Sequence, residues 1–179
     1  MSFYEITGGR PLEGAVAVQG AKNSVLPILA AALLAPGVSV IHNCPDLTDV
    51  NAAIDILRLL GCSVTREGDT VTINAASPVP AAIPERLSRE LRSSVIFMGA
   101  ILSRMGAGEL AYPGGCDLGP RPIDLHLSAL RMLGADIREE RGSLHFAWGR
   151  WPRGREVCLG LPSVGATENA MLAACGCPG

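Results

Sequence analysis

The sequence has almost no lysine and almost no net charge. Lys22 is the only lysine among 15 basic residues in a chain of 179, and the formal net charge is −2. A chain this close to neutral has no bulk attraction for nucleic acid or for an anionic membrane surface, so local cations must hold any anionic ligand. The lone lysine either survives by chance at the surface or marks a place where a compact, flexible ammonium is required.

A zinc motif, a leader and a membrane span are also missing. The six cysteines show no CxxC spacing, which argues against a zinc site. Residues 1–20 have neither the basic region nor the apolar region of a signal peptide. The longest apolar run, 25–35, contains Pro27 and is far shorter than the roughly 20 residues that span a bilayer. We therefore expect a soluble, cytoplasmic protein whose thiols are free.

Residues 113–126 are the most distinctive segment of the sequence. The first eight of these residues include three glycines and two prolines around one thiol, Cys116, which predicts a loop with unusual backbone angles. Arg121 and Pro122 close the loop, and proline suits the first turn of a helix. A fixed positive charge and a helix N-terminus beside a thiol favour the thiolate and attract anions. The alternative is a surface turn with an incidental cysteine.

The hydrophobic pattern predicts an internal repeat. Residues 57–64 resemble 130–137, and 24–25 resemble 94–95, which indicates a duplicated helix–strand–helix–strand–strand unit and places Lys22 and Arg92 at equivalent positions. We expect a leading strand at 14–19, and then a first unit with helices at 22–35 and 46–60 and strands at 38–42, 63–66 and 70–73. The second unit should have helices at 92–104 and 122–133 and strands at 106–112, 136–139 and 143–147. A third unit begins with a strand at 157–159 and a helix opened by 162–169, so we expect the protein to continue beyond Gly179.

Four segments of this pattern resemble one family. GAKNS at 20–24, PGGC at 113–116, RPIDLH at 121–126 and SVGATEN at 163–169 closely resemble the UDP-N-acetylglucosamine 1-carboxyvinyltransferase family, and the resemblance runs along the whole chain. It implies an α/β (α+β) fold of the enolpyruvyl transferase type: two inverse α/β barrels, each made of three repeats, with the substrates between them. Residues 1–20 would be a strand segment that joins the second domain. Residues 21–179 would be the first domain, with two repeats and the start of a third, and the second domain would be absent.

The resemblance also implies a reaction. The enolpyruvyl group of phosphoenolpyruvate would pass to the 3′-hydroxyl of UDP-N-acetylglucosamine with release of phosphate, which is the first committed step of peptidoglycan precursor synthesis. This ties the protein to cell wall biogenesis, cell shape and cell division, and makes it a fosfomycin target. No metal or cofactor is implied, and neither is a nucleic acid or membrane partner. We expect the whole enzyme to be a cytoplasmic monomer and residues 1–179 alone to be inactive.

The family's functional residues map onto this chain one by one. Cys116 matches the general acid, which can form a covalent adduct with phosphoenolpyruvate. Lys22, Asn23 and Arg121 match the phosphoenolpyruvate-binding residues. His126 is expected to be a structural neighbour, and the other five cysteines are expected to be ordinary core or surface residues. The residues that match the nucleotide-sugar site are Arg92, Arg121, Pro122, Ile123, Asp124, Leu125, Leu161, Pro162, Ser163 and Val164.

Two other functions are compatible with the sequence. An enolpyruvylshikimate-phosphate synthase would share the fold and the reaction type, but that family has no cysteine in the corresponding loop. A truncated barrel that binds a nucleotide sugar without turnover is the second alternative, because the expected catalytic base belongs to the missing domain.

Overall fold

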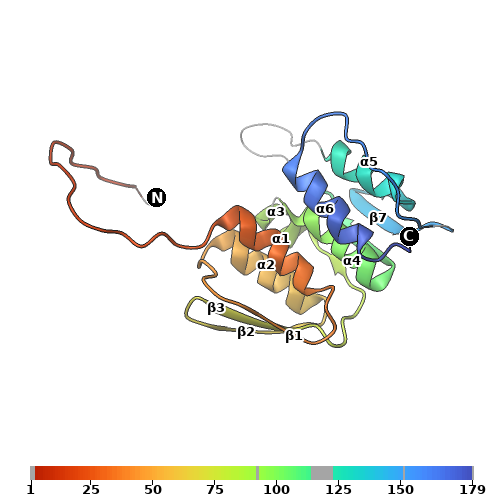
Figure 1. Cartoon of the computed structure of the whole chain (residues 1–179), viewed down its shortest axis with the longest axis horizontal. Helices are drawn as coiled ribbons and strands as arrows, with labels where there is room; N and C mark the ends of the chain where they lie inside the picture. Colours follow the sequence, from red (N-terminus) through yellow and green to blue (C-terminus); the bar gives the residue numbers. More distant parts are fainter. Residues whose placement is uncertain (1–2, 92, 114–122, 151, 179) are drawn as a thin grey trace.

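The computed structural model describes residues 3–91, 93–113, 123–150 and 152–178. Helices and strands are mixed along the chain (Figure 1). The same order of elements, helix–strand–helix–strand–strand, recurs in its two halves.

The first half is a three-stranded antiparallel sheet covered by two helices. The strand order is β1–β3–β2, with Val38 of β1 and Ser63 of β2 both opposite Asn74 of β3. β3 alternates between half-buried and buried residues, and its buried Val71 and Ile73 face the helices of this half. These elements are α1 (Lys22–Ala32), β1 (Val38–Ile41), α2 (Thr48–Leu59), β2 (Ser63–Glu67) and β3 (Thr70–Asn74).

The second half repeats this order and adds three short elements before it. Its sheet has the order β4–β5–β7–β6, in which β5, β7 and β6 correspond to β1, β3 and β2 of the first half. β4 runs parallel to its neighbour, β5, and the other described strands pair antiparallel. The elements are β4 (Ala82–Ile83), α3 (Glu85–Glu90), the 3-10 helix η1 (Ser94–Ile96), α4 (Phe97–Met105), β5 (Ala107–Ala111), α5 (Asp124–Met132), β6 (Ala135–Glu140) and β7 (Ser143–Trp148). α6 (Val164–Ala174) follows and packs on α4 and α5.

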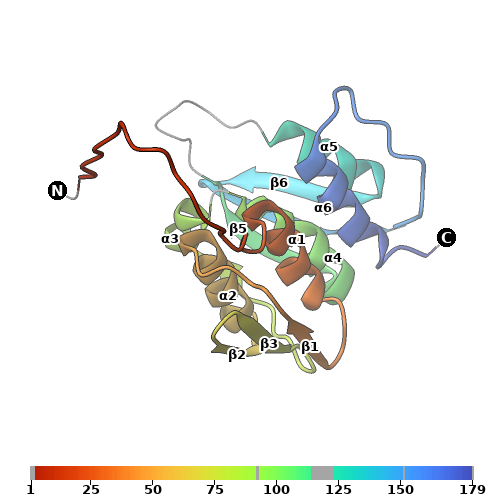
Figure 2. The same ribbon diagram turned by 60° about the vertical axis from the view of Figure 1, so that its left-hand side comes forward.

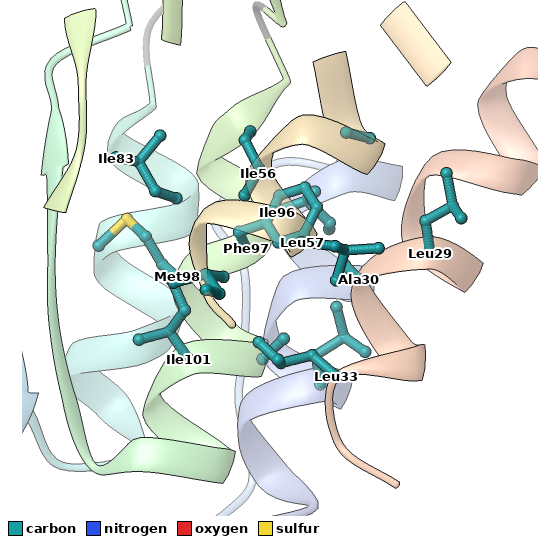
Figure 3. Close-up of a cluster of buried hydrophobic side chains, with 14 of the residues drawn as sticks. Leu29, Ala30, Leu33, Ile56, Leu57, Ile83, Ile96, Phe97, Met98 and Ile101 are labelled. Atoms are coloured by element: carbon teal, nitrogen blue, oxygen red, sulfur yellow. The ribbon is translucent and has the colours of Figure 1, made fainter. Parts of the chain in front are cut away.

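One apolar core joins the two halves. Side chains from α1, α2, β4 and α4 meet in it, among them Leu29, Leu57, Ile83 and Phe97 (Figure 3). The β1–β3–β2 sheet lies along one side of the molecule under α1 and α2, while α5 and α6 lie away from it (Figures 1 and 2).

Several predicted elements are wrong or misplaced. Residues 14–19 and 157–159 form no strand, because a strand needs a neighbour to pair with its backbone and no described residue supplies one. The single helix expected at 92–104 is divided into η1 and α4, and α5 begins at Asp124 rather than at residue 122. α2 begins at Thr48 rather than at residue 46, its N-cap is Leu47, and no side chain caps it.

Residues 3–19 leave the body of the protein as an extended arm (Figures 1 and 2). Its apolar side chains are almost fully exposed, with Phe3 at 84%, Tyr4 at 98% and Leu12 at 99%. The arm ends at Gly20, where a Cβ atom would overlap the carbonyl oxygen of Asn43. Only glycine lets the chain pass this close to Asn43 before α1 begins.

Candidate functional site

The start of α1 carries Lys22 and Asn23. No side chain caps this helix, since its N-cap residue is Ala21, so the N–H groups of the first turn point outward without a side-chain acceptor. Pro27 lies inside the helix and has no N–H to donate to the carbonyl group of Asn23. The start of α1 therefore offers backbone donors, one amide side chain and one ammonium at the same place.

An ion pair holds the Lys22 ammonium. Its Nζ atom lies 2.8 Å from Oδ2 of Asp49, at the start of α2, and both side chains are partly exposed. A pair this exposed contributes little to stability, but it fixes where the ammonium lies. Asp49 is not among the site residues predicted from the sequence.

Two adjoining cavities lie beside this helix start. The first has a volume of about 490 Å³ and is lined by the starts of α1 and η1. Its other lining residues are Ile123, which precedes α5, His126 of α5, and Val164, Gly165 and Glu168 of α6. The second, of about 500 Å³, is more polar and is lined by Lys22, Asp49, Arg89 and Glu90. Asn23, Leu26 and Ser93 line both cavities, so the two lie against each other.

Three equivalent segments of the repeat meet at the first cavity. Asn23 and Ser24 come from the start of α1, Ser93 and Val95 from the start of η1, and Val164 and Gly165 from the start of α6. Helix N-termini carry partial positive charge, so this arrangement favours an anionic ligand.

The structure brings together only some of the predicted site residues. Asn23, Ile123 and Val164 line the first cavity, and Lys22 lines the second. Pro162 and Ser163 line a third cavity, which shares Val164 and Glu168 with the first. Asp124, Leu125 and the exposed Leu161 line none of the three. Cys116, Arg92, Arg121 and Pro122 lie outside the described residues.

Two ionisable residues of the first cavity were missed by sequence reasoning. His126, expected to be only a neighbour, lies in the cavity wall, and burial lowers its pKa. Burial also raises the pKa of Glu168 on α6. Both residues belong to motifs quoted from the sequence, RPIDLH and SVGATEN, so their place in these motifs was the available signal.

Within the described ranges, no three His, Cys, Asp or Glu side chains are placed to hold a metal ion. No helix there is long and apolar enough to cross a membrane.

Comparison with known proteins identifies the family. The family model described as EPSP synthase (3-phosphoshikimate 1-carboxyvinyltransferase) matches residues 6–179. The chain belongs to this family. UDP-N-acetylglucosamine 1-carboxyvinyltransferase 2 of Caldanaerobacter subterraneus subsp. tengcongensis is 51% identical over 174 residues, which are 97% of this chain and 42% of the relative. UDP-N-acetylglucosamine 1-carboxyvinyltransferase 1 of Symbiobacterium thermophilum is 48% identical over 176 residues, which are 96% of this chain and 40% of the relative. These relatives confirm the resemblance inferred from the four motifs.

Solved structures confirm the fold class. The enolpyruvyl transferase NikO from Streptomyces tendae superposes with a TM-score of 0.76 at 26% identity, over 93% of this chain and 39% of that one. An EPSP synthase from Acinetobacter baumannii has a TM-score of 0.68 at 21% identity, over 89% of this chain and 37% of that one, and shows the fold alone. The chain thus has the enolpyruvyl transferase fold in part, and it spans about 40% of the length of the curated relatives named above.

Proposed function

We propose that this chain is part of an enzyme that transfers the enolpyruvyl group of phosphoenolpyruvate to the 3′-hydroxyl of UDP-N-acetylglucosamine. The observation that carries the proposal is the 51% identity over 97% of the chain to a protein named UDP-N-acetylglucosamine 1-carboxyvinyltransferase. The product would enter peptidoglycan precursor synthesis in the cytoplasm, which connects the protein with cell wall biogenesis, cell shape and cell division.

The two adjoining cavities support this pair of substrates. Phosphoenolpyruvate carries a phosphate and a carboxylate, and the second cavity offers the ammonium of Lys22 and the guanidinium of Arg89. The lining of the first cavity is more apolar than that of the second, and it also carries the amide of Asn23 and the imidazole of His126. This mixture of apolar and hydrogen-bonding groups suits a sugar with an attached heterocycle. The three helix starts around it favour the diphosphate of a nucleotide sugar.

The chemistry is an addition followed by an elimination. In the addition, the sugar 3′-oxygen bonds to C2 of phosphoenolpyruvate, the hydroxyl proton goes to a base, and an acid protonates C3. In the elimination, C3 loses a proton, the double bond reforms and the C2–O bond to phosphate breaks. We propose Cys116 as the acid at C3 and Lys22, Asn23 and Arg121 as the groups that hold phosphoenolpyruvate, where charge develops in the transition state.

We propose further that a second domain completes the site. The exposed apolar arm at 3–19 supports this, because Phe3, Tyr4 and Leu12 need a surface to cover them. Residues 21–179 would then form the first domain, and the base for the 3′-hydroxyl would come from the other. Residues 1–179 alone should therefore bind a nucleotide sugar weakly at most and should not catalyse the transfer.

Two measurements test the proposal, one on the chain itself and one on the intact enzyme. The first is titration of the chain with UDP-N-acetylglucosamine, followed by NMR shifts of the residues that line the first cavity. The second is alkylation of the intact enzyme by fosfomycin, an epoxide mimic of phosphoenolpyruvate, which should modify Cys116 and should be faster when the sugar nucleotide is present. An adduct on another cysteine, located by mass spectrometry, would contradict the role of Cys116.

Turnover can be tested in a chimera. This chain would replace the 174 matched residues of the Caldanaerobacter relative, and phosphate release from phosphoenolpyruvate would be measured with either UDP-N-acetylglucosamine or shikimate 3-phosphate as acceptor. We expect activity with the first acceptor only. Preference for shikimate 3-phosphate would favour the enolpyruvylshikimate-phosphate synthase alternative. If the chimera turns over neither acceptor while the parent enzyme is active, the result would favour a non-catalytic binding protein.

Lys22→Ala in this chimera should lower kcat/KM by roughly a hundredfold, as loss of other charge-stabilising groups does. Arg58→Ala is the matched control, because Arg58 pairs with Asp55 on α2 and neither residue lines any of the three cavities. Near-normal kinetics for Lys22→Ala would refute the assigned role.

A further inference from the structure

Asn169 of α6 is a fully buried polar residue with an exposure of 0%. Its side chain lies where α4, α5 and α6 meet, and it makes three polar contacts. Oδ1 accepts a hydrogen bond from the N–H of Gly99 at 2.7 Å, and Nδ2 donates to the carbonyl oxygen of Val95 at 3.0 Å. Nδ2 also lies 3.2 Å from Nδ1 of His126. An amide buried without these partners would strongly destabilise the fold.

The backbone of η1 and α4 fixes the orientation of this amide. The carbonyl of Val95 only accepts and the N–H of Gly99 only donates, so the Asn169 oxygen must face Gly99 and the nitrogen must face Val95. A flipped amide would place two acceptors together at Val95 and two donors together at Gly99. The second hydrogen on Nδ2 is then directed at His126.

This orientation determines the protonation of His126. A nitrogen that receives a hydrogen bond from Nδ2 carries no proton, so Nδ1 of the imidazole is an acceptor and the ring proton lies on Nε2. In an imidazolium ring, Nδ1–H would face the N–H of Asn169, so the contact disfavours the charged form. Burial acts in the same direction and lowers the pKa of His126.

His126 presents its other edge at the first cavity. The ring lies in the cavity wall, and its Cε1 and Nε2 atoms lie beside Gly165 in the first turn of α6, where a Cβ would come within 3.2 Å of Cε1. Among the described residues, Glu168 of α6 is the other ionisable group lining this cavity, and burial shifts its pKa upward, toward the neutral form. On α5 itself, Asp124 lies two residues before His126, at the exposed N-terminal end of the helix.

We propose that Asn169 is a positioning residue that holds His126 as the neutral Nε2–H tautomer, so that the imidazole offers a hydrogen-bond donor to an acceptor oxygen of a ligand in the first cavity. The ligand half of this proposal rests on the proposed function and assigns that oxygen to UDP-N-acetylglucosamine. The tautomer half depends only on the contacts of Asn169.

The tautomer is measured directly on the unmodified chain. Long-range ¹H–¹⁵N correlation of histidine-labelled protein near neutral pH should show an unprotonated Nδ1 and a protonated Nε2 for His126. His42 and His145 are internal references, since His42 contacts the hydroxyl of Thr70 and His145 lies near Glu109 on the exposed face of the sheet. A protonated Nδ1 on His126, or a charged ring at neutral pH, would overturn the proposal without any variant.

Asn169→Asp then tests the cause. A carboxylate has nearly the shape of the amide but only accepts, so we expect the proton to move to Nδ1 and the pKa of His126 to rise. Asn51→Asp is the matched control, because it makes the same change of charge at the exposed face of α2, where Asn51 donates to Asp46. A folded Asn169→Asp chain with an unchanged His126 tautomer would refute the positioning role. If this variant does not fold, the His126 tautomer measured on the unmodified chain decides whether the proposal stands.

The ligand half has a separate measurement. In the chimera, His126→Phe keeps an aromatic ring in the cavity wall but removes the donor, and should weaken the binding of UDP-N-acetylglucosamine roughly tenfold, the effect of one lost hydrogen bond. Unchanged affinity, together with the expected tautomer, would overturn the ligand half alone. If the chimera without this substitution binds no UDP-N-acetylglucosamine at all, both the ligand half and the proposed function fail, while the tautomer result stands.

Discussion

A methyl group added at Gly99 should push α4 and α6 apart. An ideal Cβ on this residue would overlap the backbone carbonyl oxygen of Asn169 and lie 2.5 Å from its Oδ1 and 3.1 Å from the backbone nitrogen of Ala173. Two of these three atoms belong to the backbone of α6, which cannot move by a side-chain rotation. Gly99→Ala therefore strains the place where the amide of Asn169 joins the two helices.

The size of the effect follows from three opposing contributions. Alanine in place of glycine inside a helix stabilises by about 1 kcal/mol. Overpacking a close-packed helix contact costs about 1–3 kcal/mol. Separation of the helices also weakens the buried hydrogen bond from Gly99 to Asn169, which costs about 1 kcal/mol more. We expect Gly99→Ala to lower the free energy of unfolding by about 1–3 kcal/mol.

Urea unfolding followed by far-UV circular dichroism measures this change. The midpoint should fall without a change in slope, and the thermal midpoint should fall by about 2–4 °C for each kcal/mol. Gly160→Ala is the control, because a Cβ there meets no atom within 4 Å, and it should change stability by no more than about 1 kcal/mol, in the stabilising direction. A Gly99→Ala chain as stable as the parent would show that α4 and α6 are not packed this closely.

Three further predictions concern a helix cap, two buried thiols and one imidazole. Ser163→Ala should cost about 1 kcal/mol in urea unfolding, because the Ser163 hydroxyl caps α6; an unchanged midpoint would mean that the cap does not form. Cys44 and Cys62, whose pKa values are raised by burial, should react with a thiol reagent much more slowly than the exposed Cys158 in the native chain, and at equal rates in urea. Burial lowers the pKa of His126 below its ordinary 6.5, so the unfolded chain binds that proton more readily, and stability should fall as the pH drops from about 6.5 toward the lowered value. His126→Gln should reduce this loss, and an identical pH profile would contradict it.

The repeat was the part of the fold that could be predicted from the sequence. Glycines that follow helices, such as Gly61 and Gly134, take positive φ angles, and with the apolar spacing they mark the ends of helices and the starts of strands in both halves. The 3-10 helix before α4 was not predictable in the same way. Val95 and Gly99 are four residues apart, as in a continuous helix, but both contact the amide of Asn169, which is 70 residues or more away in the chain.

The candidate site was predictable where short motifs carried it. Asn23, Ile123 and Val164 come from three motifs far apart in the sequence and line one cavity. Asp49 was not found because its contact with Lys22 spans 27 residues and no local pattern marks it. For His126, the motif gave the position but not the role, since only the fold shows which nitrogen faces Asn169.

The repeat also accounts for the polarity of the site. Each unit begins a helix at the same place, and three such starts surround one cavity although their sequences differ. The positive ends of the helices therefore come with the architecture, while the side chains differ from unit to unit: Asn23 in the first, Ser93 in the second, Val164 in the third. Duplication of a unit alone would place three equivalent helix starts around the cavity. The buried amide of Asn169 breaks that equivalence, because it holds His126 beside the third helix start, while the Lys22–Asp49 pair holds an ammonium beside the first, in the wall of the second cavity.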